Sequence, residues 1–79
     1  MKKKVPKKYF IDKPLLASIG NNMREFRLSK GMSIEKLANE CEVDSTQIGR
    51  MELGKVNFSV SYLTKIAFAL GINRKDLLP

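Results

Sequence analysis

The feature that most constrains the fold is a turn of only about three residues, Glu42 to Asp44, between two short helical segments. The first segment covers about residues 33–41 and begins at Ser33, whose hydroxyl can cap a helix. The second segment covers about residues 44–53. Each places apolar side chains three or four residues apart, which gives each helix one inward face. Any fold for this chain must therefore accommodate two short helices that follow each other almost directly.

The second of these helices has clear signals at both ends. Asp44 and Gln47 have the spacing of a capping box, in which Asp44 accepts from the Gln47 backbone while the Gln47 side chain reaches back. Gly54 is the expected end, because glycine readily adopts the left-handed conformation that closes many helices. Ile48 and Met51 form the inward pair. The residues that find no place on that apolar face are Ser45, Thr46, Gly49 and Arg50.

Helical segments also flank this pair, and no segment alternates with the period of two that is typical of strands. A first helix is predicted over about 14–30, followed by Gly31 as a left-handed closing residue. A fourth begins after a Ser59 cap and ends at Gly71, and a last single turn or two begins at Asn73. The sequence thus predicts an all-α fold.

Length and composition exclude several classes of function. At 79 residues the chain is predicted to form one domain with little spare length. One cysteine, Cys41, excludes an intramolecular disulfide, and the absence of histidine argues against a zinc site or a histidine-based catalytic centre. No apolar run is long enough to span a bilayer, and the N-terminus lacks a secretion signal. We therefore expect a soluble cytoplasmic protein with no metal, no cofactor and a buried, unreactive thiol.

Most of the net charge of +7 lies at one end of the chain. Residues 1–13 hold six lysines and one aspartate, a net of +5, whereas residues 14–79 hold nine basic and seven acidic side chains, a net of +2. A lysine-rich segment with few apolar residues is expected to form a flexible, disordered arm attracted to polyanions, with nucleic acid first and anionic membrane second. The sequence therefore predicts a basic N-terminal arm, 1–13, followed by a helical domain, 14–79.

Two helices joined by a tight turn, the second short and polar outside, form a helix-turn-helix, whose second helix enters the DNA major groove. Residues 19–78 closely resemble the lambda-repressor and Cro type of this domain, the Xre family. The matching elements, in order, are IGNNMREFR, KGMSIEKLA, VDSTQIGRMELGK, LTKIAFALGI and DLL. The resemblance implies a compact bundle of five helices, a sequence-specific transcriptional regulator and no enzymatic activity. The small size is also similar to the controller proteins of restriction and modification systems.

The resemblance implies a structural ion pair between Arg27 on the first helix and Glu52 at the end of the third. The planar guanidinium can hold a carboxylate through two bonds and still present donors toward a phosphate. Three positions depart from the usual pattern: Ile34 stands where glutamine is usual, Glu42 where glycine is frequent, and Phe58 where proline is frequent. The departures at the first two positions are expected to weaken DNA binding or alter the approach of the helix.

The candidate DNA base contacts are Ser45, Thr46, Gln47, Gly49 and Arg50. Arg50 ranks first because its forked guanidinium can bond both O6 and N7 of guanine, and Thr46 can meet a base edge or a thymine methyl. Gln47 ranks lower because the capping box competes for its amide, and Asp44 is assigned as the helix cap. Gly49 lies inside a helix at a cost of up to about 1 kcal/mol relative to alanine, which implies close approach of another helix or of DNA.

Contacts to the DNA phosphates are expected from the loop after the third helix and from the start of the second. The candidates are Ser33, Lys55, Asn57, Ser59 and Tyr62. Such contacts fix register rather than sequence, and the basic arm would add non-specific affinity by releasing counterions. Family members bind near-palindromic sites as homodimers, with half-sites about one helical turn apart. The apolar candidates for the dimer interface are Val60, Phe68, Ile72, Leu77 and Leu78.

Two classes of function remain open at this point. The first is a regulator that binds double-stranded DNA in a sequence-specific way. The second is a protein-interaction module, such as an antitoxin that covers a protein partner, with DNA binding secondary. Arg50 and the basic arm favour the first, whereas Ile34 and the modest charge of 14–79 favour the second slightly.

Overall fold

Four α-helices and one short 3-10 helix make up the fold in a computed structural model that describes residues 4–6 and 10–79. They are α1 (Lys13–Ser29), α2 (Ile34–Cys41), α3 (Ser45–Glu52), α4 (Val60–Leu70) and η1 (Arg74–Leu77). The all-α prediction is confirmed, with no strand in the described residues, and the last of the five predicted helices is a single 3-10 turn. Four of the six lysines of the predicted basic arm, Lys2, Lys3, Lys7 and Lys8, lie outside the described residues.

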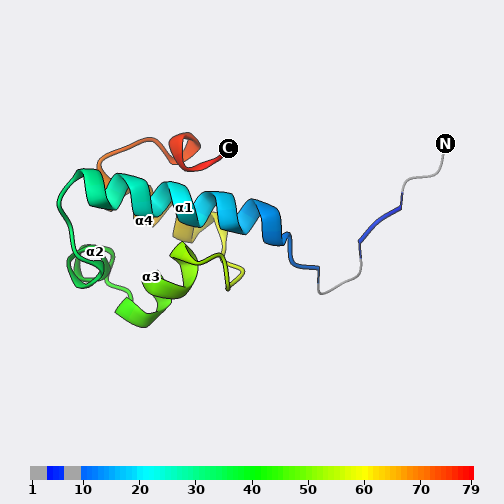
Figure 1. Ribbon diagram of the computed structural model, residues 1–79, viewed down its shortest axis with the longest axis horizontal. Helices are drawn as coiled ribbons and strands as arrows, with labels where there is room; N and C mark the ends of the chain where they lie inside the picture. Colours follow the sequence, from blue (N-terminus) through cyan, green and yellow to red (C-terminus); the bar gives the residue numbers. More distant parts are fainter. Residues whose placement is uncertain (1–3, 7–9) are drawn as a thin grey trace.

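The helices pack around α1, which crosses the middle of the molecule (Figure 1). In this view η1 and the C-terminus lie on one side of α1, and α2 and α3 lie on the other. Contacts join α1 to α3 and η1, α2 to α3 and α4, and α4 to η1. The described residues before α1 lead away from the bundle. The two helices joined by the short turn are therefore each supported by another helix: α3 packs against α1, and α2 packs against α4.

Each α-helix begins at a side chain that accepts a hydrogen bond from the first turn, which satisfies one of its unpaired backbone N–H groups. Ser33, Asp44 and Ser59 are the caps of α2, α3 and α4, as their sequence positions predict. Asp12 caps α1 by accepting from the N–H of Leu15 at 3.2 Å, and the sequence analysis missed it. As a result α1 begins at Lys13 and ends at Ser29, one residue earlier than predicted at each end.

The capping box predicted for α3 is wrong. The Asp44 carboxylate accepts from the N–H of Thr46 at 2.8 Å rather than from that of Gln47. The Gln47 N–H already donates to the main-chain oxygen of Asp44 at 3.0 Å, so this donor is satisfied without the Asp44 carboxylate. Within the described part of the chain, no hydrogen bond engages the Gln47 side chain. Its amide is therefore available for other partners.

The core lies between α1, α2, α3, α4 and η1. Its side chains include Met23, Leu37, Ile48, Met51, Ile66, Leu70 and Leu77, each no more than 1% exposed. Cys41 is also buried, as expected, and burial raises the pKa of its thiol, which keeps it neutral and unreactive. Of the predicted dimer contacts, Leu77 is fully buried and Ile72 packs against the core, so Leu77 is not available to a partner. Val60, Phe68 and Leu78 are exposed.

Two of the glycines allow α1 and the end of α3 to meet backbone to backbone. A Cβ on Gly20 would lie 2.5 Å from the main-chain oxygen of Glu52 and closer still to that of Met51. A Cβ on Gly54, where φ is +70°, would lie 2.8 Å from the Cα of Ala17. A Cβ on Gly49, by contrast, would meet no atom within 4 Å. Close approach of another helix therefore explains Gly20 but does not explain Gly49.

The two glycines inside helices form a matched pair for substitution. Gly20→Ala is expected to destabilise the fold by roughly 1–3 kcal/mol, because its methyl group overlaps main-chain atoms that have little room to move. Gly49→Ala is expected to stabilise the fold by up to about 1 kcal/mol through helix propensity alone. Urea unfolding followed by circular dichroism measures both. Equal free energies of unfolding for the two variants would contradict the proposed backbone contact.

Candidate nucleic-acid interface

The outward face of α3 is the centre of the candidate site. Asp44 caps the start of α3. Thr46 and Arg50 are exposed one turn apart on this helix, and Gln47 and Gly49 between them are partly exposed. Ser45, the first residue of α3, is also partly exposed. Side chains of this kind, with one forked cation among short hydrogen-bonding groups, suit the edges of bases in a major groove. All five candidate base contacts are thus accessible to solvent on one short helix.

A groove of about 770 Å³ runs between α3 and α1. From α3 it is lined by Thr46, Gly49 and Arg50, which are three of the candidate base contacts. Asn21 and Arg24 of α1 line the opposite wall, and the sequence analysis gave neither a role. The signal for them is their spacing with Ala17, which also lines the groove, since residues three and four apart share a face of a helix. That spacing identifies a face of α1 but not the helix that lies beside it.

The ion pair between Arg27 and Glu52 lies at the floor of this groove, and both side chains are buried. The Arg27 Nε donates to one Glu52 carboxylate oxygen at 2.6 Å, and Nη2 donates to the other at 3.1 Å. Its Nη1 donates to the main-chain oxygen of Met32 at 2.8 Å. The hydrogen bond to Glu52 raises the pKa of Arg27 against the opposing effect of its burial. The pair therefore ties α1, the loop before α2 and the end of α3 together.

The candidate phosphate contacts lie at helix starts and in the loop after α3. Ser33 and Ser59 are exposed, and their hydroxyl oxygens accept from the N–H groups of Lys36 at 3.0 Å and Tyr62 at 3.1 Å. Each hydroxyl hydrogen stays free to be donated to a phosphate, as a capping hydroxyl uses only its lone pair. Tyr62 itself is half-buried and packs against the core. The remaining two candidates, Lys55 and Asn57, are exposed.

These candidates do not all meet in one place. Asn57 and Ser59 line a second groove of about 220 Å³, which is largely apolar. Its other lining residues include Leu15, Val60 and Leu78, three exposed apolar side chains from the start of α1, the start of α4 and the C-terminus. The structure thus brings two of the candidate phosphate contacts next to two of the candidate dimer contacts. The candidate base contacts lie in the groove between α1 and α3 instead.

The three positions that depart from the family pattern are all accommodated. Glu42, in the turn between α2 and α3, adopts the left-handed conformation with φ 57° and ψ 45°, which explains why glycine is frequent there. Ile34, the first residue of α2, is half-buried and lines the groove between α1 and α3. Phe58 packs partly against the core. The wall of the groove that α2 supplies therefore lacks a side-chain hydrogen-bond donor at Ile34.

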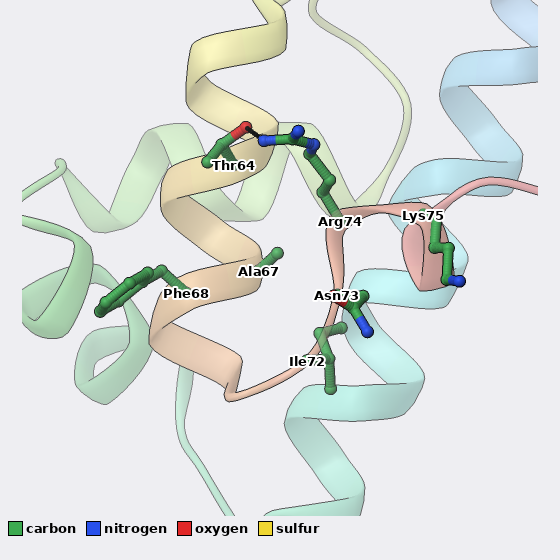
Figure 2. Close-up of a pocket in the computed structure, with 7 residues that line it drawn as sticks. All are labelled: Thr64, Ala67, Phe68, Ile72, Asn73, Arg74 and Lys75. Atoms are coloured by element: carbon green, nitrogen blue, oxygen red, sulfur yellow. Dashed lines mark hydrogen bonds between the residues drawn. The ribbon is translucent and has the colours of Figure 1, made fainter.

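A third hollow, between α4 and the segment that follows it, is lined by none of the candidate DNA contacts but by two candidate dimer contacts, Phe68 and Ile72 (Figure 2). Arg74 reaches across it and donates to the hydroxyl of Thr64 at 3.4 Å, and Phe68 of α4 is among its lining residues. Among the described residues, no cluster of three or more histidine, cysteine or acidic side chains could hold a metal ion. A search of the same residues finds no helix that is long and apolar enough to cross a membrane.

Comparisons with known proteins match most of this helical region. A family model described as helix-turn-helix, HTH_3, matches residues 23–77. Control protein C.BamHI of Bacillus amyloliquefaciens is 48% identical over 60 residues, which cover 75% of this chain and 74% of that protein. A hypothetical transcription factor of Neisseria meningitidis serogroup B is 39% identical over 67 residues, 85% of this chain and 63% of that protein. The solved structure of the restriction-modification controller protein C.AhdI from Aeromonas hydrophila aligns with a TM-score of 0.78 and 36% identity, over 80% of this chain and 96% of that chain.

Removing one partner of the buried ion pair is expected to be costly. Arg27→Ala leaves the Glu52 carboxylate without its counter-charge, which should destabilise the fold by about 3 kcal/mol and lower the melting temperature by roughly 10–25 °C. The exposed Arg74→Ala is the matched control, expected to change stability by less than about 0.5 kcal/mol. The double variant Arg27→Ala/Glu52→Ala should lose less stability than the sum of its single variants. Unchanged melting of Arg27→Ala would contradict a structural role for the pair.

Proposed function

The chain belongs to the Xre-type helix-turn-helix family HTH_3 and is a DNA-binding transcriptional regulator, and we propose that it recognises a near-palindromic operator as a homodimer. The observation that carries the proposal is the outward face of α3, where Thr46, Gly49 and Arg50 line one open groove. We propose that this helix enters the major groove of double-stranded DNA with its N-terminal residues against the bases.

Arg50 is proposed as the main base contact, bonding O6 and N7 of a guanine through two parallel N–H groups. In the described residues it has no carboxylate partner that would compete for them. Thr46 and Ser45 are proposed to contact base edges through their hydroxyls. Gln47 now ranks beside Thr46, because its amide takes no part in capping and can pair with N6 and N7 of adenine. Gly49, with open space where a Cβ would lie, supports close approach of DNA.

The backbone of the duplex is proposed to be held on either side of α3. Ser33 at the start of α2 would donate to one strand, and Lys55, Asn57, Ser59 and Tyr62 after α3 would hold the other. Helix starts favour this role because their free N–H groups and dipole attract anions. Residues 1–13 are proposed to act as a basic arm that adds affinity without adding sequence preference.

The dimer interface is proposed to involve Val60 and Leu78 rather than Phe68. Val60 is 74% exposed and Leu78 45%, and both line the apolar groove that Asn57 and Ser59 share. An interface next to candidate phosphate contacts lets two copies place their recognition helices on one side of the duplex, about one helical turn apart. Phe68 is 86% exposed but lies two turns further along α4.

A narrower role is suggested by the relatives. C.BamHI is named a control protein, and C.AhdI is named a restriction-modification controller protein. We propose that this chain is likewise a controller protein of a restriction and modification system. The alternative of a protein-interaction module is favoured by the exposed Phe68, in addition to Ile34 and the modest charge of 14–79. A stoichiometric protein partner that co-purifies through Phe68 would support it. The cytoplasmic location and the absence of enzymatic activity remain predictions.

Selection of bound duplexes from a random library tests the proposed recognition. The wild-type chain is expected to enrich an inverted repeat whose half-sites are centred about one helical turn apart. Arg50→Ala should lose about 1–3 kcal/mol of preference at one base pair of each half-site, with unchanged melting because the side chain is exposed. Gly49→Ala, which is expected to keep or raise the stability of the fold, should weaken binding to all sequences. Recovery of unrelated sequences by the wild-type chain would contradict sequence-specific recognition.

The proposed interface is tested by placing a charge on it. Val60→Glu is expected to shift sedimentation toward the monomer, because a carboxylate in an apolar contact must be desolvated without a partner. The fold should tolerate it, since Val60 is the first residue of α4 and an acidic side chain is favourable at a helix start. Phe68→Glu is the matched control on the same helix. A monomer produced by the Phe68 variant and not by the Val60 variant would place the interface at the other end of α4.

A further inference from the structure

The groove between α1 and α3 contains a second set of polar side chains, on α1, that the proposed recognition does not use. Asn21 and Arg24 line the wall opposite Thr46 and Arg50. We propose that Arg24, assisted by Asn21, binds a backbone phosphate of the DNA strand next to the bases that α3 reads. This inference rests on the proposed function, and it assigns α1 a direct role in holding DNA.

The charge of the groove calls for an anion. Three arginines, Arg24, Arg27 and Arg50, line it together with one carboxylate, Glu52. Arg27 already neutralises Glu52 through their ion pair, and in the described part of the chain neither other arginine has a carboxylate within 4.0 Å. The groove therefore holds two uncompensated positive charges.

The other side chains of the folded region carry no net charge. Residues 14–79 carry a net charge of +2, and the four charged side chains of the groove alone account for it. The other side chains of this region are six basic and six acidic, which cancel. The net charge of the charged side chains that line this one groove therefore equals the net charge of residues 14–79, and low-dielectric walls strengthen the attraction of the groove for an anion.

Helix dimensions indicate which part of DNA would meet Arg24. The major groove is about 12 Å wide and admits one helix, whereas packed helices lie about 8–10 Å apart. Gly20 brings α1 to the close end of that range, because its backbone touches that of α3. With α3 inside the major groove, α1 cannot enter beside it, so its outward side chains face the phosphates that border the groove. A long, flexible arginine that begins on α1 can bridge the remaining distance.

The position of Ile34 gives this contact a further reason. Ile34 lines the same groove from the start of α2, where the family usually has a glutamine that can hold a phosphate. An isoleucine offers no hydrogen bond, so the donors on this side of the groove must come from elsewhere. Arg24 and Asn21 supply a charge and an amide from the adjacent helix, with Arg24 able to bond two phosphate oxygens at once.

The first test measures the salt dependence of binding to a random-sequence 20-base-pair duplex. Arg24→Gln should reduce the slope of log affinity against log salt by about 0.9, the value for one lost phosphate contact. At low salt it should weaken binding roughly tenfold. Arg74→Gln is the matched control, because η1 packs against α1 and α4 and lies across α1 from α3 (Figure 1). An Arg24→Gln slope equal to that of Arg74→Gln would overturn the proposal.

The second test locates the contact on the selected operator by replacing one phosphate at a time with a neutral methylphosphonate. At one phosphate position, the neutral replacement should weaken binding of the wild-type and Arg74→Gln proteins. The same replacement should not weaken binding of Arg24→Gln, because that variant already lacks the contact between Arg24 and this phosphate. Arg24→Lys should restore the salt slope but only part of the affinity. If no phosphate position behaves this way, the proposal is wrong.

These results separate the inference from the proposed function. A wild-type chain that selects an operator through Arg50, combined with an unaltered Arg24→Gln slope, would overturn only the role of Arg24. A chain without any preferred sequence would contradict the proposed function, whereas a reduced Arg24→Gln slope on the random duplex would still support a phosphate contact. Equal melting temperatures of Arg24→Gln and the wild type are expected, since Arg24 is exposed.

Discussion

The contact between α1 and the end of α3 is the constraint on which the rest of the structure depends. Gly20 removes the only side-chain atom that would separate the two backbones, and two turns later Arg27 holds Glu52 through bonds of 2.6 and 3.1 Å. A helix of eight residues such as α3 is too short to be stable alone in water. Its stability and its direction therefore come from this contact and from the core side chains Ile48 and Met51.

This arrangement pre-organises the candidate reading face. One end of α3 is fixed by the Asp44 carboxylate and the left-handed turn at Glu42, and the other by the ion pair and Gly54. DNA binding then requires ordering of side chains such as Arg50 rather than folding of the helix, which keeps the entropic cost low. Glu42 adopts the left-handed conformation, which costs a glutamate more free energy than a glycine. The turn between α2 and α3 therefore contains some local backbone strain.

Local signals in the sequence were sufficient for most of the fold, because caps and apolar spacing act over three or four residues. Ser33, Asp44 and Ser59 cap their helices as predicted. The capping box failed because the choice between two neighbouring N–H groups depends on main-chain bonds that the sequence does not show. The wall formed by Arg24 was missed for a different reason: the helix that faces a given side of α1 is decided by tertiary packing, in which Gly20 takes part.

The charges of the chain are divided in a way that separates two parts of DNA binding. Residues 1–13 carry a net charge of +5, and in the proposed function this segment raises affinity for DNA of any sequence. In residues 14–79, the charged side chains that line the groove beside α3 sum to +2, and all the others sum to zero. Screening limits such a field to about 10 Å at moderate salt. In the proposed complex, the groove would therefore orient the domain only once it lies against the duplex, where the hydrogen-bonding face of α3 would discriminate between sequences.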